Sequence, residues 1–167
     1  MHLYKSAYAR LSRAEVPIVS ADTNSRSRDC NCQAIRQAAR HVTQFYDQLL
    51  APTGLRATQF GILSRLRREG PMSINALAAL LVMDRTTLGR NILPLERDGL
   101  IEIGRSATDR RRHELHLTEA GFDRHRAAFQ HWEAAQQRFG TVFGEDRAAA
   151  LRDLLREVAA SDFAAAG

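Results

Sequence analysis

Apolar residues recur at helical spacing through most of the chain. The first such stretch predicts an amphipathic helix of about 20 residues that begins near Cys30 and ends before Pro52 and Gly54. A second stretch predicts a helix from about Thr58 to Arg68, with Thr58 as its N-cap. The apolar positions of this second helix are expected to face inward: Phe60, Leu63 and Leu66.

Two short helices with clear N-caps follow. Ser73 precedes a helix that spans Ile74–Leu80, and Asp84 precedes one that reaches Asp98 before Gly99 ends it. Serine and aspartate are favoured at an N-cap because their oxygens accept hydrogen bonds from the unpaired N–H groups of the first turn. Two short helices joined by a tight turn are typical of a helix-turn-helix.

The pattern then changes to the two-residue alternation of strands. Residues 100–103 and 113–117 predict a hairpin, or wing, with a polar and basic connection at 104–112. Thr118 is the predicted cap of a long helix that runs to about Phe139, and one more helix follows Gly144. The apolar anchors expected in these two helices are Phe122, Phe129, Trp132, Phe139, Leu151, Leu154, Leu155 and Val158. The fold is therefore expected to be mainly α with a small β-hairpin wing.

Composition favours an anionic partner. Lys and Arg number 24 against 19 acidic residues, and the net charge of +5 favours phosphates or nucleic acid over cations. No window approaches the roughly 18 uninterrupted apolar residues of a membrane span, and no apolar signal core stands near the N-terminus. A soluble cytoplasmic protein without a membrane partner is expected. The sequence lacks the motifs of phosphate loops, serine hydrolases and metalloproteases, so we expect neither an enzyme nor a cofactor.

The second helix of the helix-turn-helix has two contrasting faces. One face carries Leu88, Ile92 and Leu95, and the opposite face carries Thr86, Arg90 and Arg97. A DNA major groove admits one helix, and Arg is the side chain best shaped to bond guanine O6 and N7 together. We therefore expect Arg90 to read a base, with Thr86 and Thr87 beside it, and Pro94 to kink the helix after them. The alternative is an ordinary solvated helix face.

The connection of the hairpin is strongly basic. Arg105, Arg110, Arg111 and Arg112 lie within eight residues, beside the single acid Asp109. A narrow, A·T-rich minor groove concentrates negative potential and attracts inserted Arg side chains. A solvated charge run is the alternative, but its place after a helix-turn-helix favours a DNA contact.

Several ordered motifs resemble one family of regulators. The matching residues are Met83-Asp84-Arg85-Thr86-Thr87-Leu88, Arg90-Asn91 with Pro94-Leu95-Glu96, Gly99-Leu100-Ile101, and the wing-to-helix signature Asp109-x-Arg111, Leu117-Thr118 and Gly121. Through these motifs, residues 30–160 resemble the multiple-antibiotic-resistance regulator (MarR) family of winged-helix repressors. The resemblance implies a recognition helix at 84–98, insertion of Arg111 into the minor groove, and a pairing of Asp109 with a nearby Arg that steadies the wing. DNA contacts are then expected from Ser73, Arg85, Thr86, Thr87, Arg90, Asn91, Arg105, Asp109, Arg110, Arg111 and Arg112.

The family binds pseudo-palindromic operators in double-stranded DNA as a two-fold dimer. Its terminal helices form the dimerisation region. Apolar stripes near 35–50 and 151–158 exceed what one small winged-helix domain needs, which favours a homodimer independently. We expect an N-terminal arm at 1–29, a dimerisation helix at 30–55, a winged helix-turn-helix at 56–118 and C-terminal dimerisation helices at 119–167. The arm carries a short predicted helix near residues 4–11. The expected function is sequence-specific repression of transcription; the alternative is a winged-helix protein-interaction module without DNA binding.

Cys30 and Cys32 stand at the start of the first helix, where unpaired N–H groups favour a reactive thiolate. This segment resembles the organic-hydroperoxide-resistance regulator (OhrR) branch of the family. The resemblance implies that Cys32 senses redox state and that Tyr46 contacts the thiolate of the partner subunit, with Arg36 in place of the branch's other tyrosine. Ordinary packing of small apolar thiols is the alternative. Zinc is a weaker option, because His41 lies half a turn around the helix from Cys32.

Members of the family that do not use cysteine often respond to small aromatic or lipophilic ligands. Their ligands bind in a cleft between the dimer helices and the winged helix. By this resemblance, the candidates to line such a cleft here are His41, Phe45, Phe60 and Arg65. Ordinary core packing is the alternative for each of them.

Overall fold

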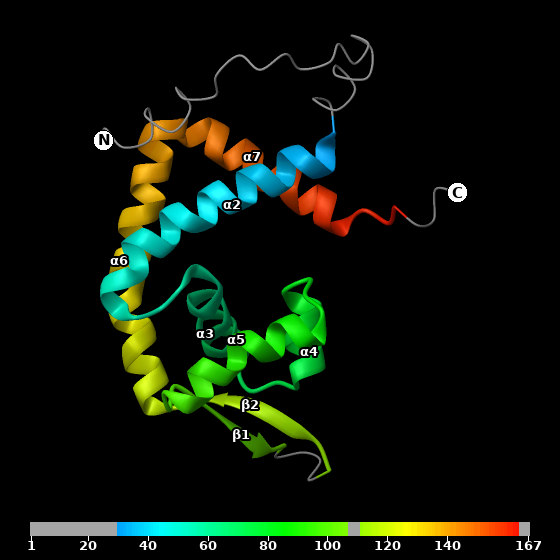
Figure 1. Ribbon diagram of the computed structural model, residues 1–167, viewed down its shortest axis with the longest axis vertical. Helices are drawn as coiled ribbons and strands as arrows, with labels where there is room; N and C mark the ends of the chain where they lie inside the picture. The colour runs from blue at the N-terminus through cyan, green and yellow to red at the C-terminus, as the bar shows by residue number, and fades with distance from the viewer. Residues whose placement is uncertain (1–29, 107–110, 164–167) are drawn as a thin grey trace, which may run out of the picture. The chain divides into compact units, whose positions relative to one another are not determined.

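We analysed a computed structural model of the chain, which describes residues 30–106 and 111–163. The N-terminal arm with its short predicted helix lies outside the described residues, as do Asp109 and Arg110 of the wing. Contacts between residues divide the chain after Arg40 into two units, of which the first contributes the exposed residues 30–40. The helical and strand elements are α2 (Asn31–Leu50), a 3-10 turn (Ala51–Thr53), α3 (Ala57–Glu69), α4 (Ile74–Leu80), α5 (Arg85–Arg97), β1 (Ile101–Arg105), β2 (His113–Leu117), α6 (Glu119–Phe143) and α7 (Glu145–Ala160) (Figure 1).

One apolar core holds the second unit together. It is formed where α3 contacts α5, α6 and β2, and where α5 contacts α4 and β1 (Figure 1). The largest side chains of this core with less than 2% of their surface exposed are Leu50, Ile62, Leu63, Leu77, Leu88, Leu95 and Ile101. Each contributes about 1.5–3 kcal/mol when it leaves water. The predicted inward positions Phe60, Leu63 and Leu66 are all buried.

The predicted hairpin is confirmed, but its first strand is longer than expected. Strands β1 and β2 pair antiparallel, with Ile101 opposite Leu117 and Arg105 opposite His113. Gly104 and Arg105 therefore belong to the strand and not to the connection. The backbone of Met72 adds a bridge to Leu115 on the other side of β2, with N–H to O distances of 2.8 and 3.4 Å. This bridge ties the segment before α4 to the hairpin.

Three of the four predicted helix caps are present. Ser73 Oγ accepts the N–H of Ala76 at 3.2 Å, and Asp84 Oδ1 accepts that of Thr87 at 2.8 Å. Thr118 Oγ1 accepts the N–H of Gly121 at 3.0 Å and donates to the carbonyl of Gly99 at 2.7 Å.

The prediction of Thr58 as the cap of α3 is wrong. The N-cap residue is Arg56, whose N–H donates to Gln59 Oε1 at 3.0 Å. Asp47 Oδ1 accepts the N–H of Ala57 at 2.7 Å. A side chain ten residues upstream therefore satisfies the first turn of α3, which short-range cap rules do not foresee.

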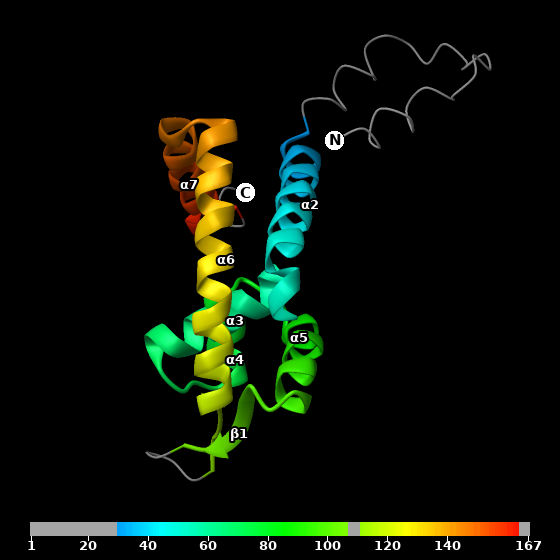
Figure 2. The same ribbon diagram turned by 90° about the vertical axis from the view of Figure 1, so that its left-hand side faces the viewer.

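Helix α6 continues beyond the expected end at Phe139 and stops at Gly144, whose φ is 95°. Of its expected anchors, Phe122 and Phe129 are exposed, whereas the residues most buried on α6 are Gly121, His125, Ala128, Ala135 and Gly140. Gly121 lies against the backbone carbonyl of Leu100, and Gly140 lies against the side chain of Glu145. The long helix connects the winged-helix elements at one end to α7 at the other (Figure 2).

Helix α7 presents an apolar face that the described chain leaves partly exposed. Leu154 is 59% exposed, and Leu155 and Val158 are each more than two-fifths exposed. Its buried residue is Ala148 alone. Within residues 30–106 and 111–163, no helix is both long and apolar enough to cross a membrane.

Candidate nucleic-acid interface

Helix α5 has the two faces that its sequence predicts. Leu88, Ile92 and Leu95 are buried against the core, while Thr86 and Arg90 are exposed on the opposite side. The helix continues past Pro94 to Arg97. The side chains proposed to read DNA are thus presented outward by a helix that is anchored along its inner face.

The Asp84 carboxylate fixes the start of α5. Hydrogen bonds from the Thr87 side chain, and then from the Thr87 N–H, hold the pKa of Asp84 below its ordinary value. Arg85 and Thr86 follow it in the first turn and are both exposed. The negative charge at the N-terminus complements the helix dipole, so the first turn of α5 is well defined.

Two of the predicted contact residues are engaged within the protein. Asn91 Nδ2 donates to the carbonyl oxygen of Thr87 at 2.8 Å. The Ser73 hydroxyl accepts the N–H of Ala76 as the cap of α4. A DNA contact from Asn91 therefore has to use its side-chain oxygen or replace this hydrogen bond.

Leu93 is a surface residue that the sequence reasoning missed. It is 63% exposed, although it is a large apolar residue inside a helix. It follows Thr86 by seven residues and Arg90 by three, so all three lie on the same side of α5. The signal was available in the sequence, because the helical spacing that places Arg90 outward also places Leu93 outward.

The described part of the wing is basic and exposed. Arg105 ends β1, and Arg111 and Arg112 precede β2; all three are exposed. The N–H of Ser106 donates to the carbonyl of Arg112 at 2.9 Å and closes the hairpin next to its tip. Figure 2 shows the hairpin beyond the end of α6 opposite to α7.

The candidate redox residues lie in different units of the chain. Cys30 and Cys32 are exposed free cysteines at the start of α2, where Cys30 O accepts the N–H of Ala34 at 3.0 Å. Tyr46 is half-buried near the other end of α2 and belongs to the second unit. Burial raises the pKa of the Tyr46 phenol, and the charge of Arg152 opposes part of this rise. Tyr46 therefore keeps its proton at neutral pH.

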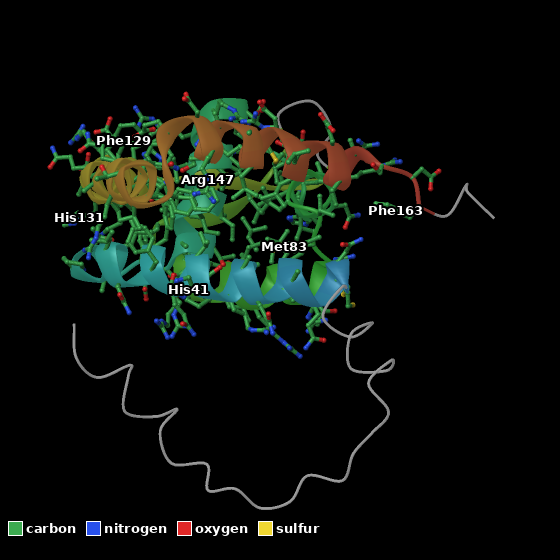
Figure 3. The ribbon with its side chains drawn as sticks, turned by 90° about the horizontal axis from the view of Figure 1, so that it is seen from above. His41, Met83, Phe129, His131, Arg147 and Phe163 are labelled. Atoms are coloured by element: carbon green, nitrogen blue, oxygen red, sulfur yellow. The ribbon has the colours of Figure 1, made fainter. Side chains whose placement is uncertain are left out.

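The structure brings together two of the four predicted pocket residues. Phe60 and Arg65 line a hollow of about 360 Å³ between the end of α2, α3 and α6, and Tyr46 and Trp132 also line it. His41 is exposed on α2 (Figure 3) and is not among the lining residues. Phe45 packs edge-on against Tyr46, with ring centroids 5.3 Å apart, and the guanidinium of Arg138 lies 5.9 Å from its ring.

Zinc binding by Cys32 and His41 is the weaker option that the sequence offers for the first helix. Within the described residues, no group of three or more His, Cys, Asp or Glu side chains is placed to hold a metal ion. The zinc option for Cys32 and His41 therefore gains no support from this part of the chain.

The core, the capped helix pair and the basic hairpin define a winged helix-turn-helix protein. Comparison with known proteins then gives the family. A sequence model of the MarR family matches residues 55–113. The M. tuberculosis transcriptional regulator MosR, solved in complex with DNA, is 32% identical with a TM-score of 0.64, over 79% of this chain and 99% of that one. The chain belongs to the MarR family.

Two further relatives extend the comparison. A mutant MarR from E. coli, solved in complex with operator DNA, has a TM-score of 0.68 at 23% identity, over 75% of this chain and 91% of that one. At that identity the likeness concerns the fold. A candidate transcriptional regulatory protein for the hcr operon of Thauera aromatica is 34% identical over 88 residues. The match spans 53% of this chain and about half (49%) of that relative.

Proposed function

We propose that this chain is a sequence-specific DNA-binding transcriptional repressor. The observation that carries the proposal is the outward face of α5, where Thr86 and Arg90 are exposed opposite three buried apolar residues. The described part of the wing adds three exposed Arg side chains. Relatives solved with DNA support the same function.

In this proposal, α5 enters the major groove and the wing enters a flanking minor groove. Arg90 donates two hydrogen bonds to guanine, with Arg85, Thr86 and Thr87 near the adjoining bases or phosphates. Arg111 reaches into the minor groove, where narrow A·T-rich DNA concentrates negative potential. Arg105 and Arg112 supply phosphate contacts.

A homodimer supplies the second half of the operator contact. The exposed apolar residues of α7, Leu154, Leu155 and Val158, need a partner surface, and Ile35 is similarly exposed on α2. Covering such side chains is worth about 1.5–3 kcal/mol each when burial is complete. A two-fold dimer then reads a pseudo-palindrome with one α5 in each half-site. Sedimentation of the Leu154→Glu, Leu155→Glu double variant should show monomer if these helices form the interface.

An electrophoretic mobility shift with the DNA upstream of the protein's own gene tests the function. The protein should shift this DNA at low salt and lose affinity steeply as salt rises, because phosphate contacts release counterions. An unrelated fragment of equal length serves as the control for sequence specificity. Absence of any shift at low salt would favour a protein-interaction module.

A small aromatic or lipophilic inducer is proposed to bind the hollow lined by Phe60, Arg65 and Trp132. The aromatic walls of the hollow suit a planar ligand, and Arg65 supplies positive charge for an anionic ligand. BpsR from Bordetella bronchiseptica, which shares this fold at 22% identity, is regulated by 6-hydroxynicotinic acid. A panel of aromatic acids should release bound DNA from the wild type, and Arg65→Gln should weaken this release.

Oxidation of Cys32 is the second proposed route to release. The thiolate sulfur attacks an organic hydroperoxide, the O–O bond breaks, and a sulfenate and an alcohol form. Both cysteines are exposed to such an oxidant. Release of DNA by hydroperoxide should therefore fail in Cys32→Ser and persist in Cys30→Ser; equal responses in wild type and Cys32→Ser would exclude this route.

A further inference from the structure

A buried histidine joins α3 to α6 through a chain of hydrogen bonds. His125 of α6 is only 4% exposed. Its Nδ1 lies 2.9 Å from an Nη atom of Arg67, and its Nε2 lies 3.0 Å from Ser64 Oγ. Ser64 Oγ in turn lies 2.8 Å from the carbonyl oxygen of Phe60. The three partners all come from α3, so His125 is a polar connection between α3 and α6.

The chemistry of the partners determines the state of the ring. Arg67 offers only N–H donors, so Nδ1 of His125 must accept its hydrogen bond. Nε2 then carries the one proton of a neutral imidazole and donates it to Ser64 Oγ, while the Ser64 hydroxyl donates to the Phe60 carbonyl. All three hydrogen bonds are satisfied together only when His125 is neutral.

The surroundings of the ring oppose a second proton. Phe60 stacks on one face of the imidazole at a centroid distance of 5.0 Å, and Phe129 lies 6.2 Å away. The charged side chains that line the adjoining hollow are Arg67 and Arg68 from α3 and Arg126 and Glu133 from α6.

The carboxylates that could stabilise a protonated ring are paired with other side chains or lie far from it. Arg68 pairs with Glu69 at 2.7 Å, and Arg126 pairs with Asp123 at 2.7 Å. Glu133 lies two helical turns beyond His125, roughly 12 Å along the axis. Within the described chain, the charged group in contact with the His125 ring is thus another cation, Arg67.

We propose that His125 is a proton-sensitive latch between α3 and α6. Protonation removes the acceptor that Arg67 uses, places two positive charges side by side and breaks the polar connection between the helices. Helix α3 packs against α5 and β2, so the loosened contact is one of those that hold the winged-helix elements on α6. Acidification thereby weakens both the folded state and its presentation of α5 to DNA; the DNA part rests on the function proposed above.

The direction of the pH effect follows from linkage. Burial, and then the charge of Arg67, hold the pKa of His125 below the ordinary histidine value of about 6.5. Above that value both the folded and the unfolded chain hold the ring neutral, and the latch contributes fully. As the pH falls through about 6.5, His125 takes up a proton in the unfolded chain but not in the folded chain. The free energy of unfolding therefore falls until the pH reaches the lower pKa of His125 in the folded state.

The first test follows the histidines by NMR and the stability by urea unfolding from pH 8 to pH 5. The His125 ring should titrate below the ordinary histidine value of about 6.5. His131, on the same helix (Figure 3), provides the control for substitution of a histidine. The folding equilibrium constant of the wild type should fall by up to about tenfold per pH unit from this group. His125→Gln should lose that component, and the matched control His131→Gln should retain it.

A second variant protects the test against simple misfolding. Arg67→Gln keeps an N–H donor for Nδ1 but removes the positive charge, so the titration of His125 should move to higher pH. Titration of His125 at or above the ordinary histidine value of about 6.5 in the wild type, or an equal pH dependence of stability in His125→Gln and wild type, would overturn the proposal.

DNA binding is then measured with the upstream fragment at fixed salt between pH 8 and pH 5, so that the range extends below the ordinary histidine value of about 6.5. The wild type should lose more affinity than His125→Gln over this range; equal losses would overturn the functional part of the proposal. If no variant binds the fragment at any pH, the proposed function fails, while the titration and unfolding results still decide whether the latch exists.

Discussion

Gly121, in the first turn of α6, lies directly against the backbone carbonyl of Leu100. A Cβ atom at this position would overlap the Leu100 oxygen and would come within 2.7 Å of Leu117 Cδ1. The N–H of Gly121 is held by the Thr118 cap, and Thr118 also bonds Gly99. The end of α5, the hairpin and the start of α6 therefore meet at a point where only a hydrogen atom fits.

Gly121→Ala should consequently destabilise the protein by about 1–3 kcal/mol, as overpacking of a closed contact does. Gly61→Ala is the matched control, because that helical glycine has open space where a Cβ would stand, and Ala in a helix gains about 0.5–1 kcal/mol over Gly. Urea unfolding of both variants gives the comparison. A Gly121→Ala protein as stable as the wild type would show that the two segments can separate without cost.

Local features of this fold could be predicted from the sequence because short-range rules fix them. Ser73, Asp84 and Thr118 cap helices through hydrogen bonds that span three residues. The alternation of apolar and polar residues before and after the basic connection predicts the hairpin. The motif that includes Gly121 is recognised by resemblance alone, and the contact with Leu100 gives its physical reason.

Long-range partners escaped prediction. Asp47 caps the first turn of α3 across ten residues, and Ser64 and Arg67 meet His125 across 61 and 58 residues. Nothing in the local pattern encodes such pairs. The candidate site also has a local part and a long-range part. Helical spacing predicts the outward face of α5, but it does not predict that Tyr46 shares a hollow with Phe60 and Arg65.

Removal of the Asp84 carboxylate should loosen the start of α5. Asp84→Ala leaves the N–H of Thr87 without its acceptor, so both the denaturant midpoint and the DNA affinity should fall, whereas Asp84→Asn keeps an acceptor and should lose less. Hydrogen bonds from the Thr87 side chain, and then from its N–H, lower the pKa of Asp84, so the stabilisation is present above about pH 3.9 and is lost as the pH falls through the lower folded-state pKa. Wild type and Asp84→Asn should therefore converge in acid; a constant difference at every pH would contradict this role.

Arg90 and Arg111 should differ in what their loss does to DNA binding. Arg90→Ala should relax base preference at one operator position by about 1–3 kcal/mol, because it removes a bidentate base contact. Arg111→Ala should weaken binding mainly to operators with A·T-rich flanks. Titration of both variants against a panel of single-position operator variants at fixed salt distinguishes the two effects. A uniform loss of affinity for Arg90→Ala across the panel would assign it to a phosphate contact.

Leu93 should add apolar recognition to the same face of α5. A leucine that is 63% exposed beside Arg90 gains little from folding, but it can cover the C5 methyl group of a thymine in the major groove. Replacing the contacted thymine by deoxyuridine removes only that methyl group, so the wild type should lose about 0.8 kcal/mol, or roughly fourfold in Kd. Leu93→Ala should bind the two DNAs with more nearly equal affinity while its urea midpoint stays within error of the wild type, because the side chain is exposed in the free protein. Each thymine of the bound upstream DNA is replaced in turn. At each position, the affinities of the wild type and Leu93→Ala for the thymine and deoxyuridine DNAs form a double-mutant cycle. If wild type and Leu93→Ala respond identically at every thymine, Leu93 makes no methyl contact and its exposure has no role in base recognition.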